Sequence, residues 1–102
     1  MHVLVVATPQ HPIPPSEMPG IVEGAADWFE RHKDELEAFG LFPGGGGFGV
    51  VDVADGEHLN QLMLEMPFSP FSHHDIYPFV PGVTGLHQLR EAMAARATAA
   101  SA

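Results

Sequence analysis

The chain has 102 residues, and 13 acidic side chains outnumber 4 lysines and arginines, which gives a formal net charge of −9 at pH 7. Nucleic acids and anionic membranes attract proteins through basic surfaces, so we expect neither as a partner. The lack of cysteine excludes disulfides, thiolate metal sites and thiol nucleophiles. Because no apolar run reaches the length of a membrane span and the start is not that of a secretory signal, we expect a cytoplasmic protein.

The first third of the sequence predicts a strand, a loop and a helix. Residues 2–8 (HVLVVAT) are apolar without alternation, which is typical of a strand covered on both faces. Four prolines within residues 9–15 exclude regular structure there, and His11 among them is a candidate for a loop over a pocket mouth. Over about residues 20–36, apolar and acidic side chains alternate at helical spacing, which predicts a helix with one buried face.

A glycine-rich turn between two strands follows. Residues 37–42 and 48–53 predict two strands, and the glycines between them supply the backbone freedom that a hairpin turn requires. Gly44, Gly46 and Gly49 also satisfy the pattern G-x-G-x-x-G. That nucleotide-binding pattern needs a strand before the loop and a helix after it, whereas here a strand follows. The sequence therefore favours a hairpin turn over a phosphate loop.

The second half predicts another helix, a strand and a last helix. Asp55 is placed to cap a helix that Pro67 ends, and residues 73–80 (HHDIYPFV) form a fourth strand. Pro78 within that strand favours an edge position, because proline cannot donate to a neighbouring strand. Residues 83–96 predict a last helix. We expect one domain over residues 1–96 and a frayed tail at 97–102.

The order of elements, β-α-β-β-α-β, predicts an α+β protein of ferredoxin-like fold with an extra C-terminal helix. In this fold the first and third strands lie at the centre of the sheet, and they are the most apolar runs here. The helices cover only one face of the sheet. A second copy is the simplest cover for the other face, so we expect a homodimer or larger homo-oligomer with sheets packed face to face, a dimeric α+β barrel.

The run VVDVADGEHLNQLMLEMPFSPF, continuing into HHDIYPFVP, resembles the muconolactone isomerase family of the dimeric α+β barrel superfamily. The resemblance implies a pocket between sheet and helices, and an activity that moves a double bond in a butenolide lactone without cofactor or metal. Such a reaction needs one group that transfers a proton and a donor for the enolate-like oxygen. Between the first helix and Asp52 a glycine run replaces polar and aromatic residues of that family, so its catalytic residues are not carried across this gap.

Three residues are candidates for catalysis. His32 shares the apolar stripe of the first predicted helix, and its imidazole titrates near neutrality; the alternative is a core histidine or a helix-end residue. By the period of two, His73, Asp75 and Tyr77 share one strand face, with His74 on the other. His73 with Asp75 would form an oriented base and Tyr77 would donate to an oxyanion. The alternative is the wet outer face of an edge strand.

The candidate substrate-binding residues are Trp28, Phe48, Met63 and Asp75. We expect no metal and no cofactor, because the sequence has no cysteine, no HExxH and no His-x-His. The function that this pattern favours is a cofactor-free lactone isomerase or cyclase acting on a small cyclic carbonyl compound. The alternatives are a non-catalytic protein that binds small molecules and a monooxygenase of the same superfamily. A titratable side chain facing an apolar cavity is the feature that separates the first from the second.

Overall fold

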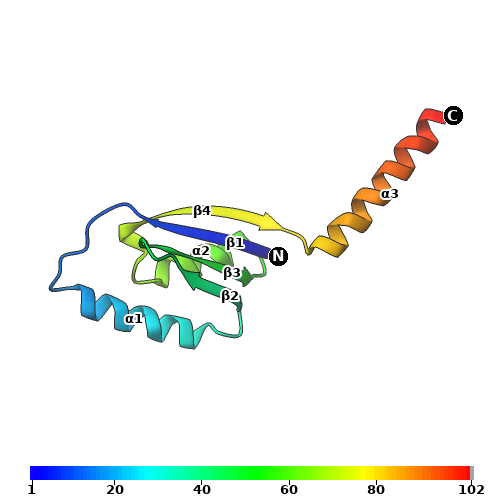
Figure 1. The fold of residues 1–102 in the computed structure, drawn as a ribbon. Helices are drawn as coiled ribbons and strands as arrows, with labels where there is room; N and C mark the ends of the chain where they lie inside the picture. The colour runs from blue at the N-terminus through cyan, green and yellow to red at the C-terminus, as the bar shows by residue number, and fades with distance from the viewer. Residues whose placement is uncertain (102) are drawn as a thin grey trace.

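The computed structural model of the chain describes residues 1–101. Its elements follow the predicted order with one short 3₁₀ helix added (Figure 1): β1 His2–Pro9, α1 Met18–Arg31, β2 Leu36–Leu41, β3 Gly47–Asp52, α2 Gly56–Glu65, η1 Ser69–Phe71, β4 Ser72–Phe79 and α3 Gly82–Ser101. The predicted ferredoxin-like α+β fold with an extra C-terminal helix is confirmed.

The four strands form one antiparallel sheet in the order β2-β3-β1-β4. The two most apolar strands, β1 and β3, lie at its centre, as predicted. β4 lies at the edge, where Pro78 pairs with Val3 in register although proline has no N–H to donate. The register therefore fits the sequence pattern of each strand.

The two faces of the sheet have different surroundings. Val3 and Val5 of β1 are buried beneath α1 and α2 in the core, and their partners Val51 and Gly49 share this face, which we call the helix face. The alternate residues point away from both helices and define the open face: His2, Leu4, Val6 and Thr8 of β1, Phe48, Val50 and Asp52 of β3, and His73, Asp75, Tyr77 and Phe79 of β4. None of these open-face side chains is fully buried in the single chain.

Two contacts hold α1 against the end of α2. A Cβ added at Gly24 of α1 would lie 3.2 Å from Cγ of Pro67, so the helix backbone approaches the end of α2 closely. The indole N–H of Trp28, which is 4% exposed, donates to the carbonyl oxygen of Leu62 at 3.2 Å. At the other end of α2, the Asp55 carboxylate accepts from the N–H of His58 at 2.9 Å, which confirms the predicted cap.

The first helix is shorter than predicted. It ends at Arg31 and not near residue 36, because the chain turns at His32, whose carbonyl oxygen accepts from Glu35 N at 2.9 Å and from Leu36 N at 3.2 Å. Leu36 then pairs with Val51 as the first residue of β2. The helical spacing of residues 32–36 was thus overridden by strand pairing.

The glycine run forms the hairpin turn that the sequence favoured. Gly45 and Gly46 have backbone φ angles of 107° and 80°, which residues with a side chain rarely adopt. The N–H of Phe42 donates to the carbonyl oxygen of Gly46 at 2.9 Å and closes the turn. A Cβ at Gly46 would collide with the carbonyl oxygen of Ala7, so the turn lies against β1.

The last helix stands apart from the rest of the chain. α3 projects away from the sheet (Figure 1), and the chain measures 69 × 25 × 23 Å as a result. It runs through residues 97–101, in a segment rich in alanine, which has the highest helix propensity. A frayed tail at residues 97–102 stays a prediction, and residue 102 lies outside the described residues. Four large apolar side chains of α3 are exposed: Val83, Leu86, Leu89 and Met93. Within residues 1–101 no helix has both the length and the apolar character of a membrane span.

Candidate active site

A cavity of about 420 Å³ lies on the helix face of the sheet. Its floor comes from all four strands, its walls from α1 and the end of α2, and its rim from the glycine turn and the proline-rich loop that follows β1. The lining is predominantly apolar. Cavities of this size and character are typical of sites for small molecules.

Few polar side chains reach this cavity. Among the described residues that line it, only His11 and His74 carry a titratable side chain, and Ser72 adds a hydroxyl. No lysine, arginine, aspartate or glutamate is among them. A proton transfer in this cavity would therefore depend on imidazole.

His74 is placed there by its position in β4. It pairs with Ala7 of β1, so its side chain points to the helix face. Burial lowers the pKa of His74 below 6.5, and the neighbouring charge of His73 lowers it further. This shift favours the neutral imidazole of His74, which is the form that accepts a proton.

His11 comes from the loop that covers one end of the cavity. The backbone N–H groups of Gln10 and His11 donate to the carbonyl oxygen of Phe71 at 2.9 and 3.0 Å, so the start of the loop is fixed to η1. The His11 residue itself is exposed. It offers a second imidazole at the rim, in contact with solvent.

Three of the four predicted substrate-binding residues line the cavity: Trp28, Phe48 and Met63. Trp28 presents an apolar surface, because its N–H is bonded to Leu62. The side chain of Phe48 lies on the open face, opposite Val6, although the residue forms part of the lining. A role of these residues in substrate binding stays a prediction.

The structure places His73, Asp75 and Tyr77 together on the open face, away from the cavity. The predicted pairing exists, since His73 Nε2 lies 3.1 Å from Asp75 Oδ1. Both side chains are about half exposed, and Tyr77 is 53% exposed. The alternation of side chains in β4 thus correctly predicted that these residues share a face. The cavity, however, lies on the opposite face of the sheet, the helix face.

His32 lies just past the end of α1, outside the cavity lining. Its Nδ1 and Nε2 are 3.2 Å from Glu35 Oε1 and 3.3 Å from Glu65 Oε2, and His58 Nε2 is 2.8 Å from the other oxygen of Glu35. A hydrogen bond from Gln61 lowers the pKa of Glu65, and the contact with His32 lowers it further. This network of side chains joins the end of α1 to α2.

Sequence reasoning did not single out His74. The alternation in β4 separates His73 from His74, but both faces of that strand carry apolar residues, so β4 alone does not tell which face the helices cover. The sequence of β1 gives no such signal either, because its run is apolar without alternation. The helix face is identified only in the structure, where Val3 and Val5 are buried and pair with Pro78 and Ile76.

The comparison with solved structures bears on the fold. Muconolactone isomerase superimposes with a TM-score of 0.70 at 16% identity, over 79% of this chain and 90% of that one. The fold is that of muconolactone isomerase. This finding confirms, for the fold, the resemblance seen in the sequence.

A second solved structure has the same fold. It is the 5-chloro-2-hydroxyhydroquinone dehydrochlorinase of Burkholderia phenoliruptrix in complex with 2,5-dihydroxybenzoquinone, with a TM-score of 0.66 at 12% identity, over 82% of this chain and 98% of that one. No protein-family model and no curated protein matches the sequence. At these identities the likeness shows a shared fold alone.

Proposed function

We propose that this protein is a cofactor-free enzyme that moves a proton within a small lactone or cyclic carbonyl compound, as an isomerase or cyclase, with His74 as the base. The observation that carries the proposal is a half-buried imidazole of lowered pKa in a predominantly apolar cavity. The fold shared with muconolactone isomerase supports the same class of reaction. His32, His73 and Tyr77, for which the sequence predicted catalytic roles, do not line this cavity.

The proposed reaction uses few groups. Neutral His74 takes a proton from the saturated carbon α or γ to the lactone carbonyl, which leaves a dienolate. The N–H of the resulting imidazolium exchanges with solvent, and the imidazolium then delivers a proton to the other of these two carbons. The lowered pKa of His74 makes the imidazolium a stronger acid, which favours this return. Ser72 and His11 are the side chains that offer a hydrogen bond to the enolate-like oxygen.

The cavity favours an uncharged substrate. Burying a carboxylate without a partner is costly, and no lysine or arginine is among the described lining residues. Muconolactone carries a carboxymethyl group, so a butenolide without that group fits the lining better. We therefore expect faster turnover of an uncharged butenolide than of muconolactone.

The active form in this proposal is a homodimer. Leu4, Val6 and Val50 on the open face are only partly buried in the single chain, and Tyr77 and Phe79 of β4 are 53% and 39% exposed. Covering this apolar surface with a second sheet removes it from water. A cytoplasmic location stays a prediction.

The test is turnover in deuterated buffer followed by NMR, with muconolactone and an uncharged β,γ-unsaturated butenolide as probes. We expect solvent deuterium in the isomerised product and a loss of about 10²- to 10⁴-fold in rate for His74→Gln. His87→Gln in the separate helix α3 is the matched control and should keep the wild-type rate.

His32→Ala, His73→Gln and Tyr77→Phe test the residues predicted from sequence. A loss in one of these three with none in His74→Gln would move the site away from the cavity. Binding of a lactone with no exchange at high protein concentration would leave a non-catalytic binding protein. Oxygen uptake with the probe would indicate the monooxygenase alternative.

A further inference from the structure

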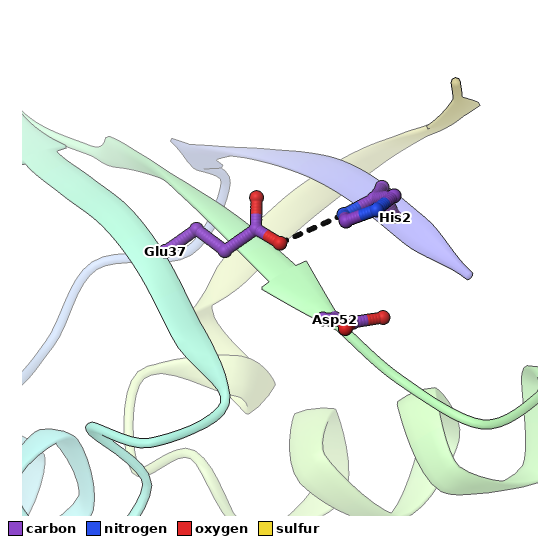
Figure 2. A group of neighbouring side chains, drawn as sticks. All are labelled: His2, Glu37 and Asp52. Carbon is purple, nitrogen blue, oxygen red and sulfur yellow. Dashed lines mark ion pairs between the residues drawn. The ribbon is translucent and has the colours of Figure 1, made fainter. Parts of the chain in front are cut away.

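Three strands bring a histidine and two carboxylates together on the open face, at the end of the sheet. His2 of β1 and Asp52 of β3 are register partners and so share a face. Glu37 lies between Leu36 and Ala38, where the pairing of β2 with β3 shifts. An extra residue in a strand re-aims its side chain, and Glu37 points toward His2 on the same side of the sheet as Asp52 (Figure 2).

The atoms of these residues that could ligate a metal lie close together, and one of them has no hydrogen-bond partner among the described residues. One imidazole nitrogen and one oxygen from each carboxylate lie within 4.8 Å of one another. His2 Nδ1 is 2.7 Å from Glu37 Oε1, yet it is shielded from solvent and its direction does not make a hydrogen bond. The Phe79 ring, with its centroid 5.6 Å from that of His2, lies next to the imidazole.

We propose that His2, Glu37 and Asp52 bind a divalent transition-metal ion of the Zn²⁺ type. The two carboxylates balance its charge, the imidazole favours zinc over magnesium or calcium, and water completes the coordination. Ligand atoms around a tetrahedral Zn²⁺ lie about 3.4 Å apart, given metal–ligand distances near 2.1 Å. In the single chain the Glu37 and Asp52 side chains are 44% and 57% exposed at the end of the sheet, so they have room there to close that gap.

This metal site is separate from the cavity. His2 is at the start of β1 on the open face, whereas His74 pairs with Ala7 near the other end of that strand on the helix face. A bound ion would tie β1, β2 and β3 together and stabilise the folded state by mass action. The competing arrangement is an ion pair between protonated His2 and Glu37, with Asp52 held by the Met1 amine at 3.2 Å. That arrangement predicts no response to the identity of the metal.

The test measures metal binding and thermal unfolding on the full chain, purified without a polyhistidine tag and stripped with a chelator. We expect Zn²⁺ to bind by calorimetry at one ion per chain and to raise the Tm, while the same concentration of Mg²⁺ does neither. Co²⁺ should give the visible absorption of a tetrahedral site. His2→Gln, Glu37→Gln and Asp52→Asn should each lower Zn²⁺ affinity by more than about tenfold, since loss of even outer-shell partners costs 10- to 100-fold.

The matched control is His73→Gln, which removes a histidine from another histidine–carboxylate pair on the same sheet face. It should bind Zn²⁺ like the wild type. Unchanged binding in both carboxylate variants, no rise in Tm with Zn²⁺, or an equal rise with Mg²⁺ would overturn the proposal. Circular dichroism on each variant separates loss of the site from loss of the fold.

Discussion

Replacing Trp28 by phenylalanine tests how α1 is held against α2 and so how the cavity wall is built. Trp28 is 4% exposed, and its indole N–H donates to Leu62 O at 3.2 Å. The regular helical donor to that carbonyl would be the N–H of Met66, but this group bonds to Met63 O at 3.3 Å instead. The indole N–H of Trp28 thus donates to a carbonyl oxygen in the last turn of α2 that has no helical donor.

The expected cost has two parts. Leaving a buried acceptor without its donor costs about 1–3 kcal/mol. The smaller ring leaves unfilled space next to Phe29 and His32, whose rings lie 5.1 and 5.0 Å from that of Trp28, and this adds roughly 1 kcal/mol. We expect Trp28→Phe to lower the free energy of unfolding by about 2–4 kcal/mol, a large part of the stability of a domain this size.

The assay is urea unfolding followed by far-ultraviolet circular dichroism, because the substitution removes the only tryptophan. All variants are compared at one protein concentration, since an oligomer would make stability depend on it. Phe39→Leu, at a side chain 55% exposed, is the control and should cost far less. A loss below about 0.5 kcal/mol for Trp28→Phe would refute the view that this hydrogen bond and ring hold α1 to α2.

Three further predictions concern stability. Gly46→Ala should lower the free energy of unfolding by about 2 kcal/mol, because Gly46 has a positive φ and a Cβ there would meet the Ala7 carbonyl oxygen. Gly44→Ala, which has open space around it, should change it by no more than about 0.5 kcal/mol, and equal losses in the two variants would contradict this explanation. Asp55→Ala should cost about 1 kcal/mol in the same assay through loss of the bond to His58 N, and no change would mean that the cap does not stabilise α2. Below the usual histidine pKa of 6.5 the unfolded chain binds a proton that folded His74 resists, so the free energy of unfolding should fall from pH 6.5 down to the lower folded pKa of His74. His74→Phe should lack this part of the pH dependence, and identical pH profiles would contradict the assignment.

The fold was largely predictable because local signals agreed with one another. The glycine turn, the Asp55 cap and the edge position of Pro78 each follow from the chemistry of single residues, and each is confirmed. The end of α1 was not predictable, because pairing of Leu36 with Val51 depends on a strand that lies later in the sequence. Long-range pairing overrode the helical spacing there.

The candidate site was less predictable, since it depends on which face of a strand the helices cover. The alternation in β4 correctly grouped His73 with Asp75 and Tyr77, but only the register with buried Val3 and Val5 shows that His74 is on the helix face. The proposed metal ligands also do not form a sequence motif. Residues 2, 37 and 52 have no fixed spacing in sequence and meet only through strand pairing and an irregularity in β2.

An NMR titration of the histidine imidazoles, with and without an uncharged butenolide, shows directly whether His74 is the base in the cavity. We expect His74 to titrate below the usual histidine pKa and its ring signals to move when the lactone is added. The ring signals of His87 should not move on addition of the lactone. If His74 titrates at the usual pKa and its signals do not respond to the lactone, while those of His32 or His73 do, His74 is not the base.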